Sequence, residues 1–312
     1  MKLIGIDIGG TKCAVISGDE NGNIVKRVSF PTENKNISVN KILSEVEKLE
    51  AEYRSDAIGI SCGGPLDNKK GIILSPPNLP GWDEVPICDM LSEKFHLPCG
   101  IMNDADACAL AEWRTGAGAG TENMVFLTFG TGLGAGLILN GKPYSGTCGN
   151  AGEVGHIRLA AAGPIGYHKA GSFEGFCSGG GIRRLGIAEA EKLLKNGNGP
   201  TYCATPDMLG GISAKTIAEA AYQGDKTAIG IYKKCGKYLG KGIAIIIDML
   251  NPEAIVIGGI YPRTKELLEP ELMKWLEKES IAESRKICRI LPAKHGEQIG
   301  DKGALAVAAM QL

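Results

Sequence analysis

A short acidic and glycine-rich segment near the start of the chain carries residues suited to binding phosphate. It reads Asp7-Ile8-Gly9-Gly10-Thr11-Lys12 and stands between two apolar stretches. Glycines in a tight turn let backbone N–H groups approach a phosphate, the Thr11 hydroxyl adds a donor, and Asp7 can hold a hydrated Mg²⁺ ion. This is not a Walker loop, because that loop leads into a helix and the residues after Lys12 read as a strand. A purely structural hairpin turn is the alternative.

A second glycine-rich segment follows the apolar residues 124–128 and reads Gly130-Thr131-Gly132-Leu133-Gly134-Ala135-Gly136. It resembles the Gly-x-Gly-x-x-Gly signature of dinucleotide-binding proteins. That signature must lead into a helix, whereas residues 137–143 read as a strand and a turn, so we disfavour a dinucleotide site. A similar order of strand, glycine turn and strand occurs in both segments. We therefore expect two phosphate-binding hairpins, one in each lobe; coincidence among 45 glycines is the alternative.

Two pairs of polar residues could act on a hydroxylated substrate. Asn103 and Asp104 stand where a strand-like segment meets an alanine-rich helix. An aspartate there can accept the proton of an attacking hydroxyl and the asparagine can orient a neighbouring one, although both could simply cap the helix. Glu153 and His156 could hold adjacent sugar hydroxyls or bind Zn²⁺, and a structural hydrogen-bonding pair is the alternative.

The elements that must position these residues alternate between strands and helices. Apolar β-branched runs beside turns predict strands, and apolar residues at helical spacing predict helices. The expected strands cover residues 2–8, 12–18, 24–30, 57–61, 99–103, 124–128 and 254–259. The expected helices cover residues 37–53, 87–96, 104–114, 182–195, 213–222, 226–250 and 303–312. This alternation predicts an α/β protein.

The length of 312 residues is sufficient for two domains that each bury a core. We place the boundary in the glycine-rich stretch 115–123. The first lobe then covers residues 1–115 and the second covers residues 116–300. We expect the last helix, at about 301–312, to return to the first lobe.

The composition favours a folded protein that acts on a small molecule. Apolar residues make up 44% of the chain and charged residues 22%, which is far from the composition of a disordered chain. The 34 Lys and Arg residues balance 35 Asp and Glu residues, so no basic field is available for nucleic acid or a membrane surface. No signal peptide or membrane span is evident, and ten cysteines without a Cys-x-x-Cys pair indicate buried thiols in a reducing, cytoplasmic setting.

Taken together, these residues resemble the ROK family of sugar kinases and sugar-responsive repressors along the whole chain. The segments that carry the resemblance are 7–12, 63–67, 75–82, 103–106, 128–136, 149–156 and 258–259. The resemblance implies an α/β protein with the two-lobed, actin-like ATPase fold, which is ribonuclease H-like, and an active site in the cleft between the lobes. It also implies ATP and Mg²⁺ as cofactors and assembly into a homodimer or homotetramer.

The resemblance further implies roles for individual residues. Asp104 would be the catalytic base, and Asp7 would hold Mg²⁺ through water. Residues implied to bind the sugar are Gly64, Pro65, Asn103, Asp104, Glu153, His156 and Glu174. Residues implied to bind ATP are Asp7, Gly9, Gly10, Thr11, Lys12, Gly130, Thr131, Gly132, Gly258 and Gly259. Family members often carry zinc on a histidine and three cysteines, but residues 163–175 contain no cysteine, so we expect no zinc.

The reaction implied is transfer of the γ-phosphoryl group of ATP to a sugar hydroxyl, as in a phosphotransferase with an alcohol acceptor. The expected acceptor is O6 of a hexose or an N-acetylhexosamine, in a glucokinase-like enzyme or an N-acetylmannosamine or N-acetylglucosamine kinase. A transcriptional regulator is the rival, but such regulators carry a helix-turn-helix module before the phosphate motif, which here begins at residue 7. A non-catalytic sugar sensor is disfavoured because both Asp7 and Asp104 are present.

Overall fold

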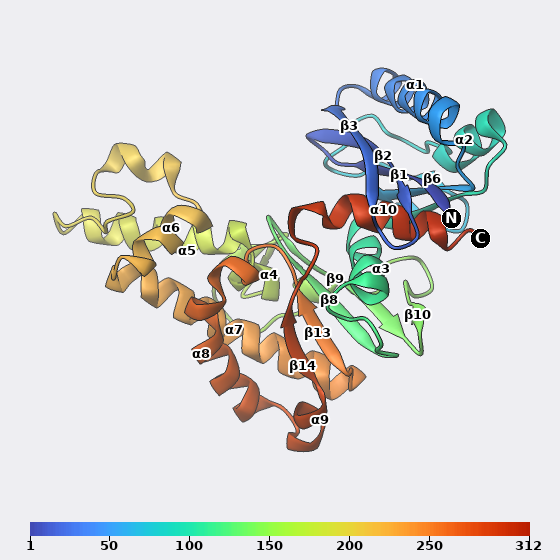
Figure 1. Cartoon of the computed structure of the whole chain (residues 1–312). Coiled ribbons are helices and arrows are strands. Elements are labelled where there is room, and N and C mark those ends of the chain that lie inside the picture. The colour runs from blue at the N-terminus through green and yellow to red at the C-terminus, as the bar shows by residue number, and fades with distance from the viewer. The chain divides into compact units, whose positions relative to one another are not determined.

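The chain folds into two compact units, and the computed structural model describes all 312 residues (Figure 1). The first unit comprises Met1–Phe126, Gly136–Ala151 and Ala293–Leu312, and the second comprises Leu127–Ala135 and Gly152–Pro292. The lobe ranges predicted from the sequence stay predictions. Each unit is built on its own core and is described separately below.

The first unit contains a five-stranded sheet in the order β3-β2-β1-β4-β7. Its strands are β1 (Lys2–Ile8), β2 (Lys12–Asp19), β3 (Ile24–Pro31), β4 (Ala57–Cys62) and β7 (Cys99–Asn103). All five were predicted to within one residue at each end. β1, β4 and β7 run parallel, whereas β2 and β3 complete an antiparallel meander. The carboxyl ends of the three parallel strands therefore meet at one edge of the sheet.

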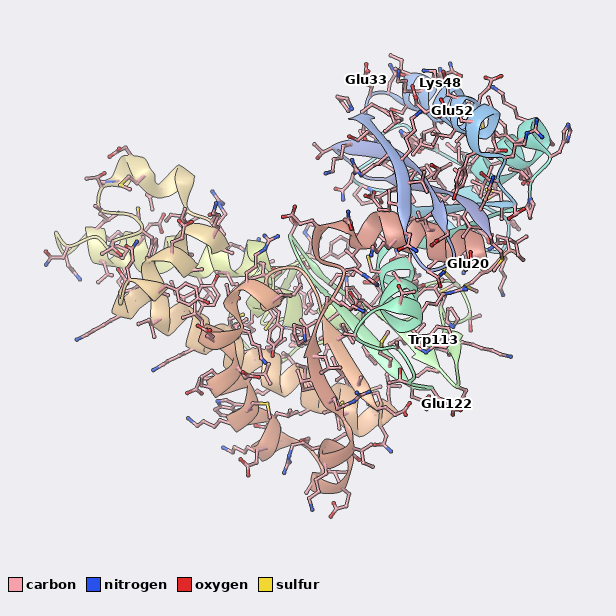
Figure 2. The ribbon with its side chains drawn as sticks, viewed as in Figure 1. Glu20, Glu33, Lys48, Glu52, Trp113 and Glu122 are labelled. Atoms are coloured by element: carbon pink, nitrogen blue, oxygen red, sulfur yellow. The ribbon has the colours of Figure 1, made fainter.

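Helices cover both faces of this sheet (Figure 1). They are α1 (Lys35–Tyr53), α2 (Ile87–Phe95), α3 (Asp104–Thr115) and α10 (Ile299–Ala309). The apolar side of α1 packs on the sheet through Val39, Ile42 and Val46, while Lys48 and Glu52 are exposed (Figure 2). α10 packs on β1, β4 and α3, and its small residues fit there because Gly59 in β4 lies directly against Ala304 and Ala308.

The last helix was predicted at 303–312, but it starts four residues earlier in the chain. It begins at Ile299 and ends at Ala309. Its preceding 3₁₀ turn, Gly296–Gln298, continues directly into the helix without a side-chain cap, so no capping residue marks its start in the sequence. This shift places Gly300 and Asp301 in the first turn, next to Asp7.

The second sheet has the order β10-β9-β8-β13-β14. Its strands are β8 (Met124–Phe129), β9 (Leu133–Leu139), β10 (Lys142–Pro143), β13 (Ala254–Ile257) and β14 (Arg289–Pro292). The strand predicted at 254–259 ends two residues earlier, because Gly259 has a φ of +62° and turns the chain into α8 (Tyr261–Glu279). The sequence analysis did not predict α8, α9 (Ala282–Ile287) or β14.

The helices of the second unit pack largely on one another, most extensively α7 on α8. They are α4 (Phe173–Phe176), α5 (Gly179–Leu194), α6 (Ala214–Tyr222), α7 (Lys226–Leu250), α8 and α9. The bounds of α7 are as predicted, since Asp225 caps its start and Asn251 ends it in a left-handed conformation. α5 begins three residues before the predicted start because the Ser178 side chain accepts a hydrogen bond from Gly181 N and caps the helix. A 3₁₀ turn, Pro206–Gly211, precedes α6.

Two short ribbons complete the fold: β5 (Leu66–Asp67) pairs with β6 (Ile72–Ile73), and β11 (Ile165–Gly166) pairs with β12 (Lys169–Ala170). All ten cysteines are free, and seven of them are buried. None of the helices combines the length and the apolar character needed to cross a bilayer.

Candidate functional site

The predicted phosphate turn joins β1 to β2 and is closed by a hydrogen bond of 3.1 Å from Gly9 N to Lys12 O. Thr32 supports the turn, since its hydroxyl donates to Gly9 O at 2.6 Å and its amide donates to Thr11 O. The amides of Gly10 and Thr11 have no partner within the protein. The carbonyls of Gly9, Thr11 and Lys12 are thus engaged, while two adjacent N–H donors are available to an anion.

Gly10 also touches a second predicted segment. A Cβ atom at Gly10 would lie 2.7 Å from Asn78 O and 2.8 Å from Asn78 Cβ, so no larger residue fits without moving that loop. The loop is held in place by Leu79 and Trp82, whose side chains are buried in the core of the first unit. The structure therefore brings segments 7–12 and 75–82 into direct contact.

Asp7 lies at the carboxyl end of β1 in a strongly negative environment. Burial and the nearby carboxylates of Asp301 and Asp104 raise the pKa of Asp7 to about 6, although Arg27 opposes this. Arg27 Nε donates to Asp301 Oδ2 at 2.6 Å. Ser61 is paired in register with Asp7, and its fully buried hydroxyl has no partner. Unbalanced negative charge beside an available hydroxyl fits a hydrated divalent cation such as Mg²⁺.

Asn103 and Asp104 lie where β7 ends and α3 begins. Asn103 is the cap: its Oδ1 accepts from Ala105 N at 3.0 Å, and Asp104 Oδ1 accepts from the same amide at 2.8 Å. Asn103 therefore does cap the helix, as the structural alternative proposed, and Asp104, the first helical residue, binds the same amide. Asp104 is nevertheless exposed to solvent on one side, where its second carboxylate oxygen is available. Crowding by protein atoms raises the pKa of Asp104, and the Ala105 N–H opposes this shift.

The loop after β4 reaches the same edge. Cys62 at the end of β4 is paired with Asn103 in register, and the chain continues directly into Gly63-Gly64-Pro65. A Cβ at Gly64 would lie 3.0 Å from Asn103 Nδ2, so Gly64 packs against that amide. The structure thus gathers Asp7, Gly64 and Asn103–Asp104 at the carboxyl ends of three parallel strands, which is where ligands bind in open α/β sheets.

The second glycine turn joins β8 to β9 and has a similar design. Gly130 N donates to Gly132 O at 3.1 Å, and the carbonyls of Gly130 and Thr131 accept from Gly179 N and Gly180 N at the start of α5. The amides of Thr131 and Gly132 have no partner within the protein. The repeated pattern noted in the sequence therefore corresponds to two turns that each leave two neighbouring N–H groups unpaired.

Glu174 lies beside this second turn. Its Oε2 accepts from Leu133 N at 3.2 Å and would lie 2.8 Å from a Cβ atom at Gly132. Gly155, in the 3₁₀ turn Val154–His156, packs between Leu133 O and Glu174 Cβ. The predicted sugar residues His156 and Glu174 thus belong to one cluster in the second unit. Glu153 is exposed at the start of the same 3₁₀ turn.

Gly258 and Gly259 adjoin the second turn from β13. Gly258 N donates to Leu127 O and Ile260 N donates to Phe129 O, so this glycine pair lies next to the end of β8. A cavity of about 420 Å³ opens nearby and is lined in part by Ile260. Its other lining residues are Ala214, Lys215, Ala218, Glu219, Tyr222, Tyr232, Arg263 and Thr264. This volume and the mixture of apolar walls with a few polar groups are typical of small-molecule sites.

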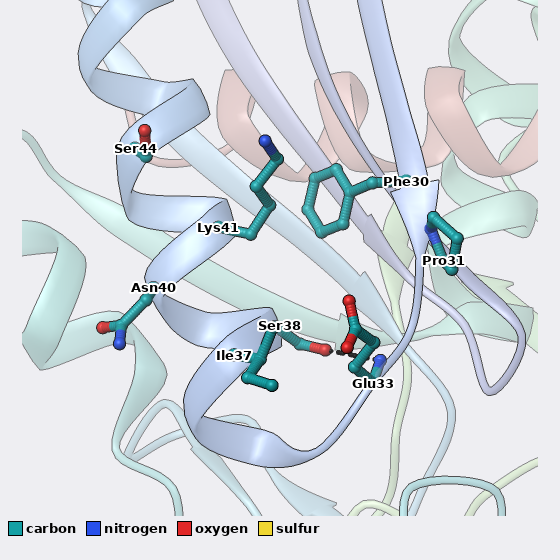
Figure 3. Close-up of a pocket in the computed structure, with 8 residues that line it drawn as sticks. All are labelled: Phe30, Pro31, Glu33, Ile37, Ser38, Asn40, Lys41 and Ser44. Atoms are coloured by element: carbon teal, nitrogen blue, oxygen red, sulfur yellow. Dashed lines mark hydrogen bonds between the residues drawn. The ribbon is translucent and has the colours of Figure 1, made fainter.

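Two further cavities lie in the first unit and contain none of the predicted site residues. The larger, of about 620 Å³, lies between the edge strand β3 and α1, and the Ser38 hydroxyl accepts from Glu33 N at 2.8 Å at its rim (Figure 3). The other, of about 250 Å³, lies at the N-terminal end of α1 and includes Asp83 and Glu84. They are separate from the residues predicted to carry the chemistry.

A zinc site is not formed by the predicted histidine. His156 lies against the ring of Tyr167 at a centroid distance of 4.9 Å, and Tyr167 contacts His168. Cys177 is buried and donates to Cys235 O. No three His, Cys, Asp or Glu side chains lie close enough together to hold a metal. The expectation of a zinc-free protein stays a prediction for elemental analysis.

Several residues of these clusters were missed by the sequence analysis. Asp301 and Arg27 flank Asp7, yet they are separated by 274 positions in the chain. The cavity residues of α6 and α7 were read only as parts of helices. A signal existed for Asp301, since an acidic residue within a small-residue helix is unusual, but nothing in the sequence shows which strand end it faces.

Comparisons with known proteins identify the family of this chain. A family model described as the ROK family matches residues 3–311. The chain is 32% identical to the glucokinase of Streptomyces coelicolor, over 98% of this chain and 96% of that protein. It is 30% identical to the N-acetylmannosamine kinase of Yersinia pestis, over 83% of this chain and 82% of that protein.

The structural comparison gives the same result. A ROK family glucokinase from Streptomyces griseus, solved in complex with glucose and AMPPNP, superposes with a TM-score of 0.80. The two are 32% identical, and the match covers 99% of this chain and 100% of that one. The predicted actin-like ATPase fold is confirmed, and the relatives support a sugar kinase. With a family match over almost its whole length, this chain belongs to the ROK family.

Proposed function

We propose that the protein is an ATP-dependent kinase that phosphorylates a hexose or an N-acetylhexosamine. The observation that carries this proposal is the convergence of Asp7, Gly64 and Asn103–Asp104 at the carboxyl ends of β1, β4 and β7. Transfer of a phosphoryl group to a hydroxyl requires three kinds of group: a carboxylate with one unengaged oxygen, an amide, and a turn with unpaired N–H groups.

Asp104 is proposed as the base. The sugar hydroxyl attacks the γ-phosphorus of ATP, the bond from that phosphorus to the bridging oxygen breaks, and ADP leaves with the electron pair. Asp104 takes the hydroxyl proton, so the products are a sugar phosphate and ADP. Its Oδ1 accepts from Ala105 N, which restrains the carboxylate and leaves the other oxygen free to take a proton. Asn103, Gly64 and Pro65 are proposed to orient the sugar, together with Glu153, His156 and Glu174.

The nucleotide is proposed to bind the two glycine turns and the cavity beside Gly258 and Gly259. The unpaired amides of Gly10, Thr11, Thr131 and Gly132 would donate to phosphate oxygens. The cavity of about 420 Å³ is large enough to hold a purine base, and Tyr222 and Ile260 supply apolar walls. When bound near Asp7, Mg²⁺ would neutralise phosphate charge.

The acceptor is proposed to be O6, as in a glucokinase. The relatives include both a glucokinase and an N-acetylmannosamine kinase, whose named substrates differ at C2, so the substituent at C2 is the feature to test. We also propose that the protein assembles as a homodimer or homotetramer, which sedimentation velocity would measure directly.

A coupled assay of ADP release over a panel of hexoses and N-acetylhexosamines tests the proposal. We expect sugar-dependent ADP release that requires Mg²⁺ and is lost in Asp104→Asn, and ³¹P–¹H correlation of the product to place the phosphate on O6. A protein whose melting temperature rises with a sugar but which releases no ADP with any of them would be a sensor or regulator and would overturn the kinase. A phosphate on another oxygen would overturn only the O6 assignment.

A further inference from the structure

Where the family resemblance implies a zinc-binding loop, this chain has a hairpin instead. No cysteine occurs between Cys148 and Cys177. Residues Ile165–Ala170 form a two-stranded ribbon, β11 and β12, whose tip consists of Tyr167 and His168. We call this ribbon the 165–170 hairpin. The ring of Tyr167 at the tip of the hairpin lies against the ring of His156.

Three contacts connect the hairpin to the His156 segment. The Tyr167 ring meets the His156 ring edge to face, with centroids 4.9 Å apart and planes at 79°. Lys169 Nζ donates to His156 O at 2.7 Å, and Arg158 Nη1 donates to Ala170 O at 3.1 Å. The ring contact meets the imidazole, and the two hydrogen bonds join strand β12 of the hairpin to the chain segment 156–158.

The base of the hairpin is fastened to the helix that carries Glu174. Gly166 leaves no room for a Cβ against Gly175 N, and the Ser172 hydroxyl, which caps α4, donates to Gly166 O at 3.4 Å. Gly171 N donates to Pro164 O and closes the ribbon. The hairpin therefore connects the backbone of His156 to that of Glu174, the two residues proposed to bind the sugar from this cluster.

The tip has a conformation that its residues do not favour. Tyr167 and His168 have φ values of +39° and +64°, a combination typical of turns made from asparagine and glycine. Tyr167 is also 63% exposed, so burial of its ring does not account for its presence. Residues held against their backbone preference are enriched at functional sites.

We propose that Tyr167 is a positioning residue that orients the His156 imidazole for the sugar, so that the 165–170 hairpin replaces a metal as the support of this part of the site. The inference rests on the proposed function in that His156 is taken to contact the sugar. Tyr167 itself acts through His156 and touches neither ATP nor the reacting atoms.

Three variants separate positioning from turn formation. Tyr167→Asn removes the ring and supplies a residue that favours positive φ, Tyr167→Phe keeps the ring, and His168→Asn relieves the neighbouring position without removing the contact with His156. For Tyr167→Asn we expect the KM for the sugar to rise about threefold to tenfold, which is the range of an edge-to-face aromatic contact. We expect the KM for ATP to stay unchanged. The melting temperature should stay the same or increase, because asparagine favours the positive φ of this position. Tyr167→Phe and His168→Asn should stay within about twofold of wild type.

A second measurement is independent of catalysis. In ¹H–¹³C spectra of the ligand-free protein, the His156 ring protons should lose the ring-current shift of Tyr167 in Tyr167→Asn and keep it in Tyr167→Phe. An unchanged His156 signal, or an unchanged sugar KM in an active Tyr167→Asn enzyme, would overturn the positioning role. If the wild-type protein phosphorylates no sugar, the proposed function fails, and the spectra still decide whether Tyr167 orients His156.

Discussion

Replacing Asp7 by asparagine should stabilise the ligand-free protein at neutral pH while weakening its use of ATP. Burial and the carboxylates of Asp301 and Asp104 raise the pKa of Asp7 from 3.8 to about 6 in the folded protein. The folded state therefore binds this proton more tightly than the unfolded state does. The resulting stability is fully present below pH 3.8 and is lost as the pH rises through 6.

The size of the effect follows from that shift. A difference of about 2 pKa units at about 1.4 kcal/mol per unit gives at most about 3 kcal/mol of strain at pH 8. Because Asp7 is only partly buried, solvent screening reduces this figure, and we expect about 1–3 kcal/mol. Asparagine has almost the same shape and carries no charge, so Asp7→Asn should remove the repulsion without leaving a cavity.

Urea denaturation of both proteins at pH 4, 6 and 8 measures this difference. The free energy of unfolding of Asp7→Asn should exceed that of wild type by about 1–3 kcal/mol at pH 8, and the gap should shrink towards pH 4. Glu52→Gln is the control, because Glu52 is exposed and pairs only with Lys26 at the surface, and it should change little at any pH. A variant that is no more stable than wild type at pH 8, or whose advantage does not depend on pH, would refute the repulsion among these carboxylates.

Four further results are expected. Asp104→Asn should lower kcat by about 10²–10⁴, or about 3–5 kcal/mol of barrier. The melting temperature should change little, because the amide oxygen of asparagine can still accept from Ala105 N. A variant with more than about a tenth of wild-type kcat in the coupled assay would exclude Asp104 as the base. Gly10→Val should raise the KM for ATP roughly tenfold or more. The KM for the sugar should rise as well, because Asn78 must move to make room for the valine. An unchanged KM for ATP would exclude this turn from the nucleotide site. Glu112→Ala should lower the free energy of unfolding by about 3–5 kcal/mol in urea denaturation, since this fully buried carboxylate accepts from three backbone N–H groups. Elemental analysis should find far less than one zinc per chain, and stoichiometric zinc would contradict the expected absence of the metal site.

Local pattern in the sequence determined most of the secondary structure and the identity of the chemical groups. Alternating and helical spacing of apolar residues depends on each segment alone, which is why β1, β7 and α7 were predicted with the bounds that the structure has. The glycine turns and Asn103–Asp104 could be found for the same reason, because turn and cap residues act within a few positions. α8 was missed although Leu268, Leu272 and Leu276 recur at helical spacing, because Pro270 lies inside the helix and argues against one. β14 was missed because it is only four residues long and only partly buried.

Only the tertiary structure determined which of these groups lie together. Parallel pairing in register places Asp7 beside Ser61 and Cys62 beside Asn103, and neither register is written into a single strand. The docking of α10 brings Asp301 to Asp7 and Arg27 from almost the other end of the chain. Burial of Asp7 in the folded protein, together with this neighbouring carboxylate, raises the pKa of Asp7. Likewise, a hairpin without any recognisable motif supports His156. Contacts over such separations depend on how whole elements pack, so the electrostatics of Asp7 and the support of His156 follow from the fold and not from the residues nearby in sequence.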